Sequence, residues 1–233
     1  DRMSAKIAGY LYPEANIQNI GFERTNYPDG YFDVAIGNVP FGDYRVNDSV
    51  YNSHGFLIHD YFFAKTLDKL RAGGVAAYIT TKGTMDKEST KVREFLFKKA
   101  ELLGAIRLPN TAFKNAGTKV TADILFLQKR EKEIENPEWI AVTEDAQGFR
   151  INSYFVQHPE MILGTMQEIS GPYGMETTCV EKEGVPLGER LRAAISHITG
   201  HIPERVEEER AEFRYGEEQP TDAPDASEVR MYS

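Results

Sequence analysis

The chain contains 233 residues, of which 41% are hydrophobic and 11% aromatic, as is typical of a globular protein with a sizeable core. A single cysteine, Cys179, excludes an internal disulfide framework, and no apolar run is long enough to cross a bilayer. We therefore expect a soluble, cytoplasmic protein without a membrane partner.

The net charge of −9 is unevenly distributed along the sequence. Residues 65–132 contain 15 Lys and Arg against 7 Asp and Glu, which gives this stretch a net charge of +8. Lys82, Lys87, Lys91 and Arg93 are candidates for phosphate contacts, although a solvated helical face explains them as well. Residues 204–233 are rich in acids and poor in apolar side chains, so we expect a disordered tail.

The predicted elements alternate between helices and strands. Apolar residues at helical spacing predict a helix over residues 2–11, and residues 15–20 have the pattern of a short strand. A buried strand at 31–36 is followed by a polar loop, and an amphipathic helix at 56–70 is expected to be stopped by Gly73 and Gly74. The later elements are strands at 75–80, 102–108, 122–128 and 139–142, and helices at 87–100 and 187–198. This order predicts an α/β fold whose doubly wound sheet ends in an antiparallel strand pair.

The most informative segment is the end of the strand at 31–36, where Asn38, Val39, Pro40 and Phe41 follow a glycine. Ligands of open α/β sheets bind beyond the carboxyl ends of the strands. The Asn38 amide offers an acceptor and two donors in one plane, which suits the exocyclic amine of adenine. Pro40 fixes the chain direction, and Phe41 supplies a flat face for a base. The plain alternative is a strand followed by a proline turn.

This segment resembles the Asn-Pro-Pro-aromatic signature of S-adenosylmethionine-dependent N6-adenine DNA methyltransferases, with Val39 at the first Pro position. The variant is similar to the one used by large methylase–helicase proteins of mobile genetic elements. Three further blocks support the resemblance: Ile58 to Phe62, Gly73-Gly74-Val75, and Ile106 to Phe113 together with Thr121 to Leu125 and Lys129.

The resemblance implies a Rossmann-like methyltransferase domain over residues 1–132, a small α+β extension of unknown role at 133–203, and the acidic tail at 204–233. Family members hold the methionine part of the cofactor on a glycine-rich loop after the first strand, and the ribose on an acid after the second. Neither strand precedes the helix at 2–11. We therefore expect a fragment of a longer protein, inactive alone, in which the strand at 15–20 pairs directly with that at 32–36 or stays unpaired.

The resemblance also assigns roles to single residues. Asn38, Pro40 and Phe41 would be catalytic, and Phe22 and Asn38 would contact the cofactor, S-adenosylmethionine. Phe41 and Phe113 would bind the substrate base, and no metal is required. Phe22 is nearly as well explained as a core residue, and Phe113 as the anchor of a loop.

The implied activity is methyl transfer from S-adenosylmethionine to N6 of adenine in DNA, with DNA as partner and a helicase domain in the same full-length chain. Two alternatives remain open. One is a catalytically inert DNA-binding module of a helicase-like protein, and the other is a methyltransferase that acts on RNA or on a protein glutamine.

Overall fold

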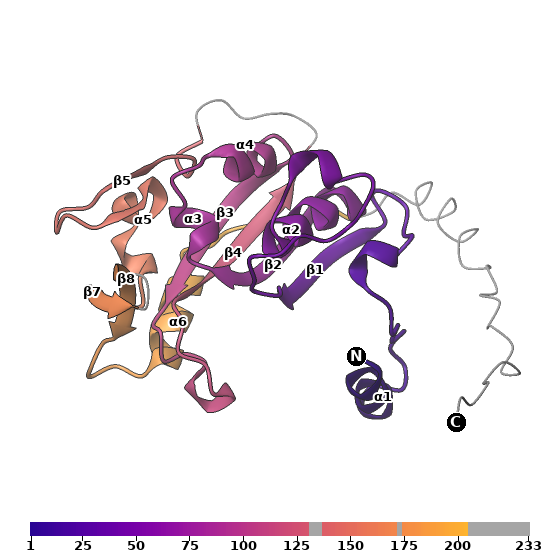
Figure 1. The fold of residues 1–233 in the computed structure, drawn as a ribbon, viewed down its shortest axis with the longest axis horizontal. Coiled ribbons are helices and arrows are strands. Elements are labelled where there is room, and N and C mark those ends of the chain that lie inside the picture. Colours follow the sequence, from indigo (N-terminus) through magenta and orange to yellow (C-terminus); the bar gives the residue numbers. More distant parts are fainter. Residues whose placement is uncertain (131–136, 172–173, 205–233) are drawn as a thin grey trace, which may run out of the picture. The chain divides into compact units, whose positions relative to one another are not determined.

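The computed structural model describes residues 1–130, 137–171 and 174–204, and residues 1–202 form one compact unit (Figure 1). The predicted disordered tail falls, apart from Glu204, outside the described residues. Within the described part of the chain, no helix has both the length and the hydrophobicity needed to cross a bilayer.

The centre of the unit is a four-stranded sheet in the order β1-β2-β4-β3. Its strands are β1 (Phe32–Asn38), β2 (Leu70–Thr81), β3 (Ala100–Leu108) and β4 (Ala122–Lys129). β1 and β2 are parallel, whereas β4 is antiparallel to both of its neighbours. This mixed sheet confirms the predicted α/β class and the antiparallel pair. Because β1, β2 and β3 run in the same direction, they all finish at one end, which we call the carboxyl end of the sheet.

One face of the sheet is covered by α2 (Ile58–Lys69) and α4 (Lys91–Phe97), with the short α3 (Gly83–Asp86) between β2 and α4 (Figure 1). The Phe63 ring packs against Tyr78, whose hydroxyl is 2.7 Å from the Thr66 hydroxyl. Phe63 and Leu67 are fully buried, and burying such a side chain contributes about 1.5–3 kcal/mol. This packing fixes α2 against β2, the strand that pairs with the one carrying Asn38.

Two boundaries on this face differ from the prediction. α2 ends at Lys69, and β2 already begins at Leu70, so Gly73 and Gly74 lie inside the strand. They form a bulge: Gly73 has φ +76°, and a Cβ on Gly74 would lie 2.9 Å from the Asp33 carbonyl oxygen. The glycines therefore allow β1 to approach β2 closely, rather than ending a helix. The helix predicted at 87–100 is α4 alone, and α3 was not predicted.

The N-terminal region confirms one prediction and corrects another. α1 (Arg2–Leu11) has the predicted bounds and is capped by Asp1, whose carboxylate accepts hydrogen bonds from the amides of Met3 and Ser4. The predicted strand at 15–20 is wrong, because these residues are not paired with any described strand. Within the described sheet β1 is an edge strand, and its Ile36 is 77% exposed.

Residues 137–202 pack against the β3 side of the sheet. They form β5 (Val142–Glu144), β6 (Arg150–Asn152), α5 (Ser153–Gln157), β7 (Gly164–Gly171), β8 (Gly174–Glu181) and α6 (Leu187–Ile195). Short 3₁₀ helices lie at Phe22–Arg24, Asn52–His54, Lys114–Ala116 and Pro159–Met161. The strand predicted at 139–142 is wrong, since β5 starts at Val142, whereas the helix predicted at 187–198 is confirmed as the shorter α6.

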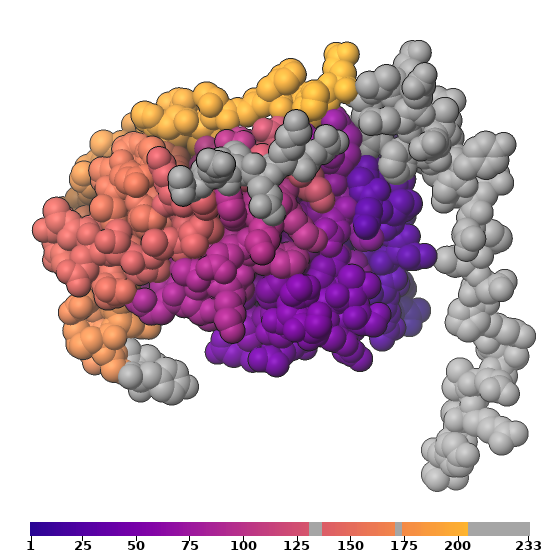
Figure 2. Space-filling model, turned by 90° about the horizontal axis from the view of Figure 1, so that it is seen from above, coloured from indigo at the N-terminus to yellow at the C-terminus, as the bar shows by residue number. Residues whose placement is uncertain are grey.

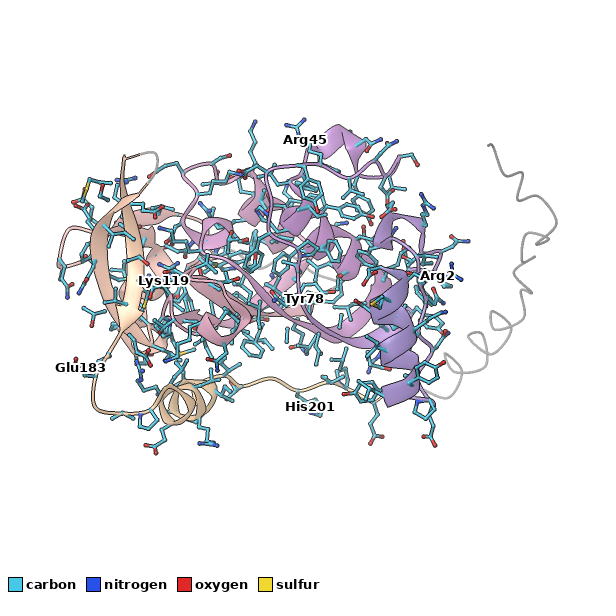
Figure 3. The ribbon with its side chains drawn as sticks, turned by 60° about the horizontal axis from the view of Figure 1, so that its bottom comes forward. Arg2, Arg45, Tyr78, Lys119, Glu183 and His201 are labelled. Atoms are coloured by element: carbon cyan, nitrogen blue, oxygen red, sulfur yellow. The ribbon has the colours of Figure 1, made fainter. Side chains whose placement is uncertain are left out.

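These later residues share one hydrophobic core with the sheet. Trp139, Ile151 and Phe155 are buried in the same cluster as Leu125 of β4. The segment after α6 runs along the sheet face opposite α2, where Gln128 Nε2 donates to the His201 carbonyl over 2.7 Å (Figure 3). In the space-filling view, the orange residues of the β5–β8 region lie at the left, the violet N-terminal region lies at the right, and the yellow segment near residue 200 runs along the top (Figure 2). The division into a methyltransferase domain and an extension remains a prediction.

Candidate functional site

Asn38 is the last residue of β1 and lies opposite Ile79 of β2. The next amide, that of Val39, donates to the Ile79 carbonyl over 3.1 Å, so the pairing continues one residue beyond the strand. The Val39 side chain is buried, and alternation along the chain directs the exposed Asn38 side chain to the other face. Among the described residues the Asn38 amide has no hydrogen-bonding partner, so its acceptor and donors are available to a ligand.

Pro40 and Phe41 continue the chain beyond the carboxyl end of the sheet. Pro40 is exposed, whereas Phe41 is partly buried against the main core. The core therefore fixes the position of the Phe41 ring while leaving part of it accessible. Its assignment as a stacking residue remains a prediction.

The polar loop after Phe41 is tied to α2 by a buried carboxylate that the sequence analysis missed. Asp48 accepts hydrogen bonds from Tyr61 Oη at 2.8 Å, Lys65 Nζ at 3.0 Å and the Val50 amide at 3.1 Å. Burial opposes the charge of Asp48, but the hydrogen bond from Lys65 and the other donors outweigh it and lower its pKa. The available signal was an Asp in an Asn- and Ser-rich loop, followed by Tyr61 and Lys65 four residues apart on one helix face.

A second buried polar cluster lies where β3 and β4 meet the carboxyl end. Arg107 donates to both Asp123 oxygens, at 2.9 and 2.8 Å, and its Nη1 is 2.8 Å from Asp86 Oδ2. The Phe155 ring lies 4.3 Å from the guanidinium carbon. Burial works against the charge of Arg107, but the two carboxylates outweigh it and raise its pKa, so this side chain stays protonated. The signal in the sequence was a single charged residue within each of the strands predicted at 102–108 and 122–128, namely Arg107 and Asp123.

Two other predicted site residues occupy separate places. Phe22 packs against α2, with ring centroids 4.9 Å from Phe62 and 6.1 Å from Tyr61. Phe113 is partly buried against the main core in the loop after β3. Since neighbouring strands are roughly 4.8 Å apart, β1 and β3 are separated by about 14 Å, and no ring contact joins Phe41 to Phe113 among the described residues. The roles given to Phe22 and Phe113 remain predictions.

One of the basic residues is not available to a ligand. Arg93 is only 1% exposed and donates to the carbonyls of Ile140 at 2.7 Å and Thr84 at 3.3 Å. Arg93 therefore does not lie on a solvated helical face, and it does not reach a phosphate. Lys87 and Lys91 are exposed, and Lys82 is partly buried.

The residues present fit part of an S-adenosylmethionine site. The exposed Asn38 amide suits the place where the methyl group meets its acceptor, because it can hold an amine at the end of the sheet. The described residues include no glycine-rich turn after a strand on the N-terminal side of β1, which the methionine part would require. No group of three or more His, Cys, Asp or Glu side chains that could hold a metal occurs in the described part of the chain.

Comparisons with known proteins point to one family. The sequence model of the family "N-6 DNA Methylase" matches residues 13–164. The chain is 33% identical over 138 residues to "Defense against restriction protein B" of Escherichia phage P1, and the match covers 57% of this chain and 6% of that protein. The chain thus spans a small part of the curated relative that it matches.

Solved structures give weaker similarities. A proposed class I S-adenosylmethionine-dependent methyltransferase from Listeria monocytogenes has 23% identity and a TM-score of 0.39, over 50% of this chain and 38% of that one. A modification subunit of a proposed type I restriction enzyme from Vibrio vulnificus YJ016 has 24% identity and a TM-score of 0.37, over 45% of this chain and 24% of that one. Because the family match covers more than half of the sequence, the chain belongs to the N-6 DNA methylase family, as its Asn38 segment predicts, and the cofactor of that family is S-adenosylmethionine.

Proposed function

We propose that this chain forms the substrate-binding and catalytic-motif part of an enzyme that methylates N6 of adenine in DNA. Family membership supports methyl transfer. The observation that supports the specific site is the exposed Asn38 amide, which has no described protein partner and is held at the end of β1 by the hydrogen bond between the Val39 amide and Ile79.

In the proposed mechanism, Asn38 acts on the amine of the substrate. Adenine N6 is a poor nucleophile because its lone pair is delocalised into the ring. Asn38 Oδ1 and the backbone carbonyl next to Pro40 accept the two N6 hydrogens, which directs the lone pair out of the ring plane. S-adenosylmethionine, when bound, supplies an electrophilic methyl group. The chain contributes by positioning the amine and by electrostatic fit, without a covalent enzyme intermediate.

Phe41 binds the base in this proposal. N6 is unreachable for in-line attack inside a duplex, so the adenine is flipped out and stacks on an aromatic ring. Stacking of this kind is worth about 1–3 kcal/mol per base. The partial burial of Phe41 against the core limits its motion, which suits a stacking surface.

The decisive experiment replaces Asn38 in the longer protein that contains this chain. We expect Asn38→Ala to abolish methyl transfer to a DNA duplex while the circular dichroism spectrum stays unchanged, because the exposed amide supports no described contact. Asn16→Ala, in the exposed segment before β1, is the matched control and should keep full activity. Normal transfer by Asn38→Ala would refute the assignment.

A second candidate function is a catalytically inert DNA-binding module, in which the longer protein would also lack the glycine-rich turn for the methionine part of the cofactor. Calorimetric titration of S-adenosylmethionine separates the two. Binding by the longer protein but not by this chain supports the enzyme, and binding by neither supports the inert module. Micromolar binding by this chain alone would contradict the prediction that it lacks part of the cofactor site.

A further inference from the structure

The loop between β3 and β4 projects from the carboxyl end of the sheet (Figure 1). Its charged side chains are positive. We call residues 109–121 the β3–β4 loop. It contains Lys114 and Lys119, both exposed, and no acidic residue. Lys119 lies on the side of the sheet that faces β7 and β8 (Figure 3). No described acidic side chain pairs with either lysine, so both charges are available to an anionic partner.

The base of this loop is fastened by β8. The Asn110 amide donates to the Cys179 carbonyl over 2.7 Å, and the Cys179 amide donates to Thr121 Oγ1 over 2.9 Å. Thr178 Oγ1 accepts from Asn110 Nδ2 at 3.1 Å and is 2.9 Å from Thr121 Oγ1. The side chains of Asn110, Thr121 and Thr178 are at least 95% buried. One hydroxyl therefore joins both ends of the loop inside the protein.

The same strand also contacts the end of β2. Lys82, the residue after β2, donates from Nζ to the carbonyl oxygen and to Oγ1 of Thr177. β8 thus touches the segments that follow β2 and β3 and the one that precedes β4, all at the carboxyl end. β7 and β8 pair with each other in antiparallel fashion as a hairpin, and its exposed residues include the acids Glu168 and Glu176, which would repel phosphates. The hairpin is therefore suited to support a binding surface and not to form one.

The separation of the loop from Asn38 suits an extended polyanion. β1 and β3 are about 14 Å apart across the sheet. That distance corresponds to about four base-pair steps of a duplex. A DNA molecule with one base at Asn38 would therefore extend past the β3–β4 loop.

We propose that Lys114 and Lys119 contact the DNA backbone and that Thr178 is the positioning residue that holds their loop in place. This inference rests on the proposed function, because the partner is its DNA substrate. The family match ends at residue 164, so β8 lies beyond the segment that the family model covers. Residues 174–181 thereby have a role in substrate binding.

The lysines are tested by the salt dependence of binding. The affinity of this chain for a short fluorescein-labelled DNA duplex is measured by fluorescence anisotropy over a range of KCl concentrations. Lys114→Gln and Lys119→Gln should each lower the slope of log K against log salt by about 0.9. Lys98→Gln, an exposed lysine after α4 at the opposite end of the sheet, should leave the slope unchanged. An unchanged slope in both loop variants, or no binding by the wild type, would overturn the proposal.

Thr178 is tested by its coupling to the lysines. Thr178→Val keeps the side-chain volume but removes the hydroxyl, so the β3–β4 loop loses its position. The salt slope should then fall by up to about 1.8, as expected for the double variant that combines Lys114→Gln with Lys119→Gln. Adding Thr178→Val to that double variant should have no further effect, whereas Thr178→Ser should behave as wild type. Additive losses would show that Thr178 does not act through the loop. If Thr178→Val does not fold, Thr121→Val tests the same contact from the other side.

Failure of this proposal is distinguishable from failure of the proposed function. The binding measurements need neither S-adenosylmethionine nor methyl transfer. Asn38→Ala changes no charge, so it should leave the salt slope unchanged even where it abolishes catalysis. If the lysine variants lose slope as expected but Asn38→Ala still transfers methyl groups at the wild-type rate, only the catalytic assignment is refuted.

Discussion

A single hydrogen bond beyond the end of β1 determines where the Asn38 amide lies. The Val39 amide donates to Ile79, and the buried Val39 side chain prevents the backbone from rotating at this point. An exposed side chain is thus presented from a rigid backbone. This arrangement suits a group that must hold a substrate amine without rearrangement.

The next aromatic residue is Phe41, and its proposed stacking is tested with a DNA duplex that has an abasic site opposite the target adenine. We expect Phe41→Ala to weaken the affinity for this duplex by about 10-fold, because the ring that stacks on the base is lost. Phe41→Trp should restore most of the affinity. Fluorescence titration with 2-aminopurine at the target position measures both. Equal losses in the two variants would argue against stacking.

Asp48 and Lys65 make the loop after Phe41 sensitive to acid. Because hydrogen bonds lower the pKa of Asp48, its contribution to stability is complete above its unfolded pKa and is lost as the pH falls through its lower folded pKa. We expect Asp48→Asn to lower the free energy of unfolding by about 3 kcal/mol at neutral pH, since it leaves Lys65 buried and unpaired. The difference from wild type should shrink below about pH 4.

Urea unfolding at neutral pH and below about pH 4 checks this expectation. Asp43→Asn, in the same loop but exposed, is the matched control and should change stability little. A difference that persists in acid would mean that the charge of Asp48 is not what stabilises the loop.

At the scale of the element, the glycines of β2 set the spacing of the two strands that position Asn38. A Cβ on Gly74 would lie 2.9 Å from the Asp33 carbonyl oxygen and 3.0 Å from that of Arg71, and backbone atoms of paired strands cannot move aside independently. We expect Gly74→Ala to lower the free energy of unfolding by about 1–3 kcal/mol. Gly9→Ala, in α1 with no atom within 4 Å of the new Cβ, should instead stabilise its helix by about 0.5–1 kcal/mol. Denaturant unfolding of the two variants gives the comparison.

The elements that could be predicted are those whose pattern is local. α1, β1 and the core of β2 follow from apolar spacing in a short window, and the Asn38 segment from its place after an apolar strand. The strand predicted at 15–20 failed because a strand needs a partner, and these residues do not pair with the edge strand β1 or with any other described strand. The Asp48–Lys65 pair and the contacts of Thr178 were missed because they join residues that are 17 or more positions apart.

At the scale of the whole molecule, the outer face of β1 is the most exposed apolar surface of the sheet. Ile36 is 77% and Val34 46% exposed, and α1 buries none of its residues. Unpaired apolar strands promote association between chains. We therefore expect this chain to self-associate, and Ile36→Lys to reduce the association without lowering its melting temperature. Sedimentation velocity measures the effect, and Ile20→Lys, in the exposed segment before β1, is the control.

The core shared by Phe155 and the sheet also limits where the chain can be divided. Arg107 of β3 contacts Asp123 of β4 on one side and the Phe155 ring on the other. A chain that ended at residue 130 would lack the ring and leave the Arg107 cation, which is buried here, without that cover. The chain therefore cannot be divided between β4 and β5 without opening the core around Arg107.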